Sequence, residues 1–125
     1  MPSVIIADPD PTSRKALMLW LVYKMGVDEI VQVADGEELI KQIEIAVPDI
    51  ILMDWDLPHR PPLEYCQDVQ LNHSALQWVI LSVNGIVSEE ARCWFPWFLQ
   101  KGASPEAIFS LLKKVIRTFP DPLPW

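Results

Sequence analysis

The sequence has only two cysteines and two histidines among 125 residues, and these four side chains are not spaced like metal ligands. Cys66 and Cys93 have no companion cluster of cysteine or histidine, so we interpret both as reduced structural thiols. His59 and His73 fall in predicted loops. The sequence therefore predicts neither a cysteine–histidine metal site nor a phosphohistidine.

Long apolar runs and an excess of basic charge are also missing. No segment approaches the roughly 20 apolar residues that a membrane span needs, and residues 1–3 lead into a predicted strand instead of a signal segment. We therefore expect a cytoplasmic protein without membrane contact. Ten basic residues against seventeen acidic residues give a net charge of −7, which argues against direct nucleic-acid binding.

Half of the residues are hydrophobic, and the chain is long enough for one domain with a buried core. Short apolar segments alternate with segments of helical periodicity, which indicates an α/β fold, a doubly wound parallel sheet with helices on both faces. We assign residues 1–119 to this domain and 120–125 to an extended proline-rich tail. Strands are expected at 3–7, 29–34, 50–54, 77–82 and 97–100, and helices at 11–25, 36–46, 63–71, 89–92 and 105–119.

Several helix ends carry local signals. Asp10 and Pro11 form an N-cap followed by proline at the first helical position, and Gly26 ends the same helix. Asp35 begins a second helix in a pattern that resembles a capping box, and Pro48 prevents that helix from continuing. These signals predict helix boundaries without reference to the apolar pattern.

The most informative stretch is residues 48–58, with the sequence PDIILMDWDLP. Its apolar positions predict a strand that is buried on both faces and ends at Asp54. Ligands bind at the C-terminal edge of an open parallel sheet, so Asp54 is placed to act as a metal ligand or as a nucleophile that accepts a phosphoryl group. The alternative is that Asp54 only opens a turn.

Three other polar residues are expected at the same edge of the sheet. Asp8 follows the first strand, Ser82 ends the fourth and Lys101 follows the fifth. A phosphoryl group on Asp54 would then meet a hydroxyl and an ammonium, which are groups that hold the equatorial oxygens in phosphoryl transfer. Alternatively, Ser82 is a simple strand end and Lys101 is a solvated turn residue.

Nearly the whole chain resembles the receiver domains of two-component response regulators. The resemblance is carried by three motifs: VIIADPDP from residue 4, continuing to Arg14; PDIILMD from residue 48, continuing to Pro58; and FLQKGASPE from residue 98. It implies a flavodoxin-like sheet with strand order 2-1-3-4-5. It also implies a signalling module whose only chemistry is self-catalysed phosphoryl transfer to and from its own aspartate.

The resemblance assigns a role to each site residue. Asp54 becomes the phosphoacceptor, Ser82 the switch hydroxyl, Lys101 the phosphate-contacting lysine and Phe98 the switch aromatic, for which plain core packing is the alternative. Asp8 and Asp54 become ligands of Mg²⁺. The implied partners are a histidine kinase or phosphotransfer protein and an unknown downstream protein target.

The acidic site departs from the family pattern at one position. Family members carry two adjacent acids after the first strand, and here the second is Pro9, which has no side-chain oxygen. Because Mg²⁺ prefers near-octahedral oxygen ligation, we expect its binding to be weakened. Asp56, through its backbone carbonyl or its side chain, and more weakly Asp10 are candidates to replace the lost ligand.

Two further departures affect the surroundings of the site. Pro61 and Pro62 stiffen the loop after Asp54, where the family tends to have glycine. The span from Ser82 to Lys101 is also shorter than usual, which predicts a fourth helix that is truncated or unwound.

That shortened span contains a cluster of aromatic residues. Alternate side chains of a strand point in opposite directions, so some of these rings are expected to be exposed for a partner. The segment Trp94–Lys101 and the last helix are therefore the predicted surface for a partner protein or a homodimer. The alternative is that the rings fill the space left by the short helix. The aromatic residues are Trp94, Phe95, Trp97 and Phe98.

We interpret the sequence as a stand-alone receiver that is phosphorylated on Asp54. No effector domain follows Pro120, so the output is expected through protein contact, unless the chain is part of a longer regulator. The main alternative, favoured by Pro9, is a pseudo-receiver that signals without phosphorylation. A small hydrolase is disfavoured because the sequence offers no general base and no pocket-forming insertion.

Overall fold

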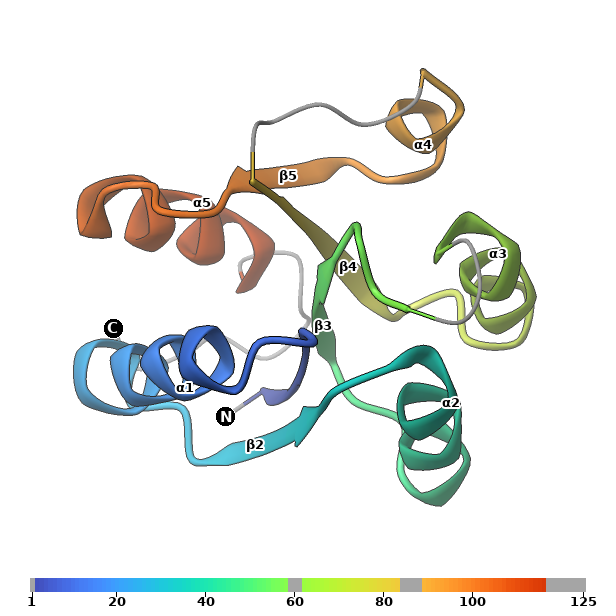
Figure 1. Ribbon diagram of the computed structural model, residues 1–125, viewed down its shortest axis with the longest axis horizontal. Helices are drawn as coiled ribbons and strands as arrows, with labels where there is room; N and C mark the ends of the chain where they lie inside the picture. The colour runs from blue at the N-terminus through green and yellow to red at the C-terminus, as the bar shows by residue number, and fades with distance from the viewer. Residues whose placement is uncertain (1, 59–61, 84–88, 117–125) are drawn as a thin grey trace.

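The computed structural model describes residues 2–58, 62–83 and 89–116, which form a single five-stranded sheet (Figure 1). All four neighbouring strand pairs are parallel, and the strand order β2-β1-β3-β4-β5 confirms the predicted topology. The elements are β1 (Ser3–Ala7), α1 (Pro11–Met25), β2 (Glu29–Val33), α2 (Gly36–Ile45), β3 (Ile50–Asp54), α3 (Pro62–Asn72), β4 (Gln77–Ser82), α4 (Glu89–Trp94), β5 (Trp97–Gln100) and α5 (Pro105–Ile116).

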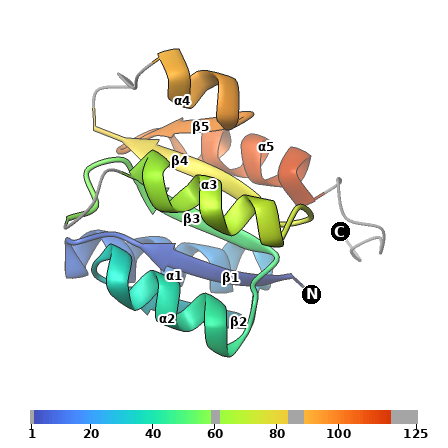
Figure 2. The ribbon, with the colours of Figure 1, turned by 90° about the vertical axis from the view of Figure 1, so that its right-hand side faces the viewer.

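The helices cover the sheet in two layers, with α1 and α5 on one face and α2, α3 and α4 on the other (Figures 1 and 2). Alternate strand residues enter the two cores because successive side chains of a strand point to opposite faces. Ile51 packs with the residues of the α2 and α3 side, whereas Leu52 packs with those of the α1 and α5 side. All five residues of β3 are buried, which confirms the prediction of a strand covered on both faces.

The cap signals in the sequence correspond to real helix ends. An Oδ1 atom of Asp10 accepts a hydrogen bond from the Thr12 N–H (3.0 Å), and Pro11 is the first residue of α1. The helix ends at Gly26, whose φ of 68° lies in the left-handed region that glycine adopts without strain. Asp35 accepts from the Glu38 N–H (2.9 Å), and Glu38 in turn accepts from the N–H of Ala34 (2.8 Å).

The remaining boundaries differ from the predicted ones by a residue or two. Helix α3 begins at Pro62, because proline is tolerated in the first turn of a helix, and it continues to Asn72. The fourth helix is short, six residues long, as the sequence predicted. The predicted proline loop (Pro61), the end of the last helix (Phe119) and the tail at 120–125 lie outside the described residues.

Candidate functional site

The C-terminal edge of the sheet brings together the four polar residues that the sequence singled out. Asp8 follows β1, Asp54 ends β3, Ser82 ends β4 and Lys101 follows β5. Asp8, Asp54 and Ser82 are buried, with exposed fractions of 2%, 3% and 6%. Buried carboxylates need a charged partner or hydrogen bonds, because desolvation of an unpaired charge is costly.

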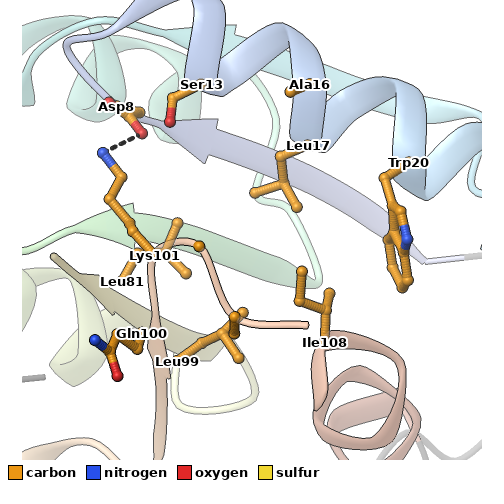
Figure 3. Close-up of a pocket in the computed structure, with 12 residues that line it drawn as sticks. Asp8, Ser13, Ala16, Leu17, Trp20, Leu81, Leu99, Gln100, Lys101 and Ile108 are labelled. Carbon is orange, nitrogen blue, oxygen red and sulfur yellow. Dashed lines mark ion pairs between the residues drawn. The ribbon is translucent and has the colours of Figure 1, made fainter. Parts of the chain in front are cut away.

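Lys101 is the charged partner of both carboxylates. Its Nζ atom lies 2.6 Å from Oδ2 of Asp54 and 2.7 Å from Oδ2 of Asp8. Figure 3 shows the lysine side chain extending from the end of β5 toward Asp8. Its backbone N–H donates to the carbonyl of Ser82 (2.8 Å), which fixes the start of the turn. Lys101 is therefore an ion-pair partner and not a solvated turn residue.

The ion pairs determine the protonation of the lysine. Burial alone would lower the pKa of Lys101, but hydrogen bonds and charge attraction from Asp54 and Asp8 outweigh it, so the pKa is raised above its ordinary value. Lys101 is thus fully charged at neutral pH. With both carboxylates ionised, the three groups carry a net charge of −1.

The second oxygen of each carboxylate is held in the same way at both positions. Oδ1 of Asp8 accepts from the backbone N–H of Asp10 (2.8 Å), and Oδ1 of Asp54 accepts from the backbone N–H of Asp56 (2.9 Å). Each carboxylate is therefore anchored by the amide two residues further along and by the shared lysine. Such anchoring fixes the direction of the oxygens before any ligand arrives.

Arg14 is a residue near the site to which the sequence gave no role of its own. Its Nη1 atom donates to the backbone carbonyl of Asp8 (2.7 Å), which ties the first turn of α1 to the end of β1. Its Nε atom is buried and has no hydrogen-bond partner among the described residues. In the sequence, the contact between Arg14 and Asp8 is indicated only by the position of a basic residue one helical turn after the cap at Asp10.

The donor set suits a weakly held Mg²⁺. Asp8 and Asp54 offer two buried carboxylates, and Mg²⁺ is commonly bound by one or two carboxylates that complete their shell with water and phosphate oxygens. Asp10 is exposed and caps α1, and Asp56 is exposed and contributes its N–H to Asp54, so their role as ligands stays a prediction. Within residues 2–58, 62–83 and 89–116, no group of three or more acidic, histidine or cysteine side chains is arranged to hold a metal ion.

The aromatic cluster is divided between core and surface. Phe95 is 3% exposed and packs against Trp78, with ring centroids 6.0 Å apart, so for Phe95 the space-filling alternative is correct. Trp94 is 40% exposed and is the member of the cluster that offers the most ring surface to a partner.

The two aromatic residues of β5 are half-buried. The Nε1 atom of Trp97 donates to Oε1 of Gln77 (3.3 Å), which holds this indole against β4. Phe98 packs against the core beneath α2 and α3, and the guanidinium of Arg92 lies over its ring at 5.4 Å. Phe98 thus contributes to the core while one face of its ring contacts a cation.

A cavity of about 270 Å³ adjoins the acidic site between α1 and α5 (Figure 3). Asp8 and Lys101 lie at its polar end. The remainder is mainly apolar, and the Trp20 side chain projects from α1 to line it (Figure 3). Its apolar lining includes Leu17, Trp20, Leu99 and Ile108.

We compared the sequence with models of known protein families, and the result agrees with the two buried aspartates and the lysine at this edge of the sheet. A family model described as the response regulator receiver domain matches residues 4–113. The chain belongs to this family. Receiver domains are signalling modules of two-component systems that interact with histidine kinases or phosphotransfer proteins, and they typically bind Mg²⁺ at their acidic site.

Individual relatives are distant. The transcriptional activator protein ExaE of Pseudomonas putida is 23% identical over 116 residues, which is 90% of this chain and 54% of that protein. The chain therefore spans about half the length of that curated relative.

Solved structures share the fold. The two-component transcriptional regulator AraC of Clostridium phytofermentans has a TM-score of 0.78 at 22% identity, covering 94% of each chain. The isolated REC domain of RcsB from Salmonella enterica serovar Typhimurium, in the presence of phosphomimetic BeF3-, has a TM-score of 0.81 at 16% identity, covering 94% of this chain and 89% of that one. No helix in the described part of the chain combines the length and the apolar character that crossing a membrane requires.

Proposed function

We propose that this receiver domain accepts a phosphoryl group on Asp54 from a histidine kinase or phosphotransfer protein, and that it signals by contact with another protein. The observation that carries the proposal is the buried Asp54 carboxylate with the Lys101 ammonium 2.6 Å from its Oδ2 atom. A nucleophile of this kind needs a fixed orientation and a nearby positive charge.

The proposed transfer is a displacement at phosphorus. An oxygen of Asp54 forms a bond to phosphorus while the bond between phosphorus and the donor atom breaks, and the bonding electron pair leaves with the donor, an imidazole nitrogen of a phosphohistidine. Negative charge spread over the equatorial oxygens is stabilised by cations and hydroxyl groups. Mg²⁺ held by Asp8 and Asp54 would neutralise part of this charge.

Lys101 and Ser82 have distinct roles in this proposal. Lys101 is bound to Asp8 as well as to Asp54, so it can turn toward a phosphoryl oxygen while it keeps Asp8 as a partner. Ser82 is buried at the end of the neighbouring strand, and its hydroxyl is the proposed second group for a phosphoryl oxygen. Both residues are positioned by the β4–β5 register, since the Lys101 N–H bonds to the Ser82 carbonyl.

The test is intact mass spectrometry after incubation with acetyl phosphate and Mg²⁺. The wild type should gain one phosphoryl group, and Asp54→Asn should gain none, because it lacks the nucleophilic carboxylate. Asp28→Asn is a matched control, since it removes an exposed carboxylate away from the site and should label like the wild type. Equal labelling of Asp54→Asn and wild type would show that another residue is the acceptor.

The alternative is a pseudo-receiver that binds partners without phosphorylation. It is favoured by Pro9, which removes a metal ligand from the family pattern. In that case the wild type stays unlabelled even with a phosphorylated donor protein, and Asp54→Asn binds the target as well as the wild type does.

The proposed output surface comprises the segment Trp94–Lys101 and α5. Trp94 is its exposed aromatic anchor, and Phe109 on α5 is 37% exposed. Aromatic anchors contribute a large share of binding energy in protein interfaces. We propose that this surface binds the downstream protein target, with a homodimer as the second candidate.

A further inference from the structure

Helices α1 and α5 cover one face of the sheet and α2 and α3 lie on the other (Figure 1), and these two helix pairs have opposite net charge. Helices α1 and α5, on one face, contain five basic residues and one acidic residue, a net charge of +4. Helices α2 and α3, on the other face, contain five acidic residues and one basic residue, a net charge of −4. The basic set is Arg14, Lys15, Lys24, Lys113 and Lys114, against Glu106, and the acidic set is Glu37, Glu38, Glu44, Glu64 and Asp68, against Lys41.

The basic face also exposes apolar surface. Residues 16–23 of α1 form an unbroken apolar run, so the side of the helix away from the sheet is apolar as well. Leu19 and Tyr23, 40% and 79% exposed, lie one turn apart on that side. At 3.6 residues per turn, Lys15 and Lys24 lie to either side of these two residues. This surface is an apolar stripe between positive charges.

The acidic face contains a groove of matching chemistry. A cavity of about 280 Å³ lies between α2 and α3, with an apolar floor that includes Ile43 and Val69 and with Glu44 and Asp68 in its walls. Two strongly exposed apolar side chains, Ile45 (75%) and Leu71 (79%), stand at the C-terminal ends of the same two helices. The groove therefore offers an apolar site between negative charges.

We propose that the α2–α3 groove binds helix α1 of a second copy of this chain. The pairing places the stripe of Leu19 and Tyr23 over the apolar floor, and it places Lys15 and Lys24 near the acidic walls. A symmetric pairing of two basic faces is disfavoured because it would juxtapose like charges. The contact joins two different surfaces, so each copy keeps one free surface of each kind and association proceeds head to tail.

This association does not depend on phosphorylation of Asp54, because neither surface includes the acidic site. Each copy carries a net charge of −7, so attraction arises only where the two oppositely charged faces meet. Salt screens such contacts over about 8 Å at physiological ionic strength. Association should therefore weaken as salt is added.

The test uses sedimentation velocity of the full chain over a range of protein and salt concentrations. The groove variant is Glu44→Lys, and its matched control is Glu89→Lys, which makes the same change on α4, outside both surfaces. The face variant is Lys15→Glu combined with Lys24→Glu. Wild type and control should self-associate, and each variant alone should associate at least roughly tenfold more weakly, since like charges then face each other.

The decisive sample is the mixture of the two variants. The groove variant retains a working basic face and the face variant retains a working groove, so the mixture should form a complex that neither variant forms alone. Trp94→Ala alters the proposed output surface and should leave this association unchanged. All three charge variants should melt within a few degrees of the wild type, since they alter exposed residues.

Four results would overturn the proposal: a wild type that is monomeric at every concentration, a closed dimer that persists in both variants, a mixture without a complex, or loss of association in Trp94→Ala. Binding of a free basic peptide in the groove of a chain that remains monomeric would also exclude a second copy as the occupant.

Discussion

The Nζ atom of Lys101 lies 2.6 Å from Oδ2 of Asp54, and this contact connects the turn after β5 to the end of β3 across the intervening strand β4. Because Asp54 is 3% exposed, the lysine supplies charge neutralisation that water cannot provide there. The same ammonium also serves Asp8, so a change at position 101 alters both carboxylates at once.

Replacing Lys101 by methionine should lower the free energy of unfolding by up to about 3 kcal/mol, because it leaves two buried carboxylates without their cation. Partial exposure of the lysine side chain (19%) reduces the loss below that of a fully buried pair. Urea denaturation at pH 7 measures it. Lys101→Arg keeps the charge, so its free energy of unfolding should fall less than that of Lys101→Met. Lys114→Met makes the same change at an exposed site. If Lys101→Met lost no more stability than Lys114→Met, the ion-pair assignment would be wrong.

The raised pKa of Lys101 predicts a pH dependence of stability. A group whose pKa is raised by folding stabilises the folded state below its unfolded pKa, which for lysine is about 10.4. That stabilisation is lost as pH rises through the folded value. The difference in melting temperature between wild type and Lys101→Met should therefore be constant from neutral pH to about pH 10 and then shrink. A difference that persists at higher pH would exclude titration of Lys101 as its source.

Substitution of Pro9 by aspartate should tighten Mg²⁺ binding, since it returns a carboxylate oxygen beside Asp8. Fluorescence titration is suitable because Trp55 is half-buried next to Asp54, and its backbone N–H donates to the Leu81 carbonyl (2.8 Å). Pro9→Asn, which removes the proline without adding charge, is the control, and its affinity for Mg²⁺ should rise much less than that of Pro9→Asp. Equal affinity of wild type and Pro9→Asp would show that another ligand already takes that place.

Alanine substitutions should separate the aromatic cluster into core and surface members. Phe95→Ala creates a cavity against Trp78 and should cost about 3–5 kcal/mol, whereas Trp94→Ala should cost less because Trp94 is 40% exposed. Thermal melts measure the costs, and binding to a downstream target tests the Trp94 surface. If Trp94→Ala unfolds as readily as Phe95→Ala, position 94 belongs to the core.

Burial raises the pKa of the Cys66 thiol, which should therefore be unreactive in the folded protein. Its exposed fraction is 1%, and its sulphur lies 3.8 Å from that of Met53. Alkylation with iodoacetamide at pH 8 followed by peptide mass spectrometry should label Cys66 in urea but not in buffer. Rapid labelling of the native protein would mean that α3 opens readily from the sheet.

The sequence predicted the sheet well because its signals are local. The apolar run before Asp54 and the caps at Asp10 and Asp35 each depend on a few neighbouring residues, and each corresponds to an element of the structure. The edge position of Lys101 also followed from chain order alone, since parallel strands place their C-terminal ends together.

Side-chain partners could not be predicted in the same way. The sharing of Lys101 between two carboxylates depends on the β4–β5 register and on a turn at Gly102 with a φ of 82°, neither of which is visible in the sequence. The contact from Arg14 to the Asp8 carbonyl depends on how α1 docks on the sheet. Four residues of β5 are too short a pattern to decide which aromatic rings face the core.

The packing of Phe95 on Trp78 gives β4 a mechanical role. Ser82 ends this strand at the acidic edge, and Trp78 lies four residues earlier, about 13 Å away along an extended strand. β4 pairs with β3 on one side and with β5 on the other, and it connects Ser82 to the Trp78 ring, on which Phe95 packs at the junction of α4 and β5. The side chain at position 78 can therefore alter the geometry of the Trp94 surface without contact with the acidic site.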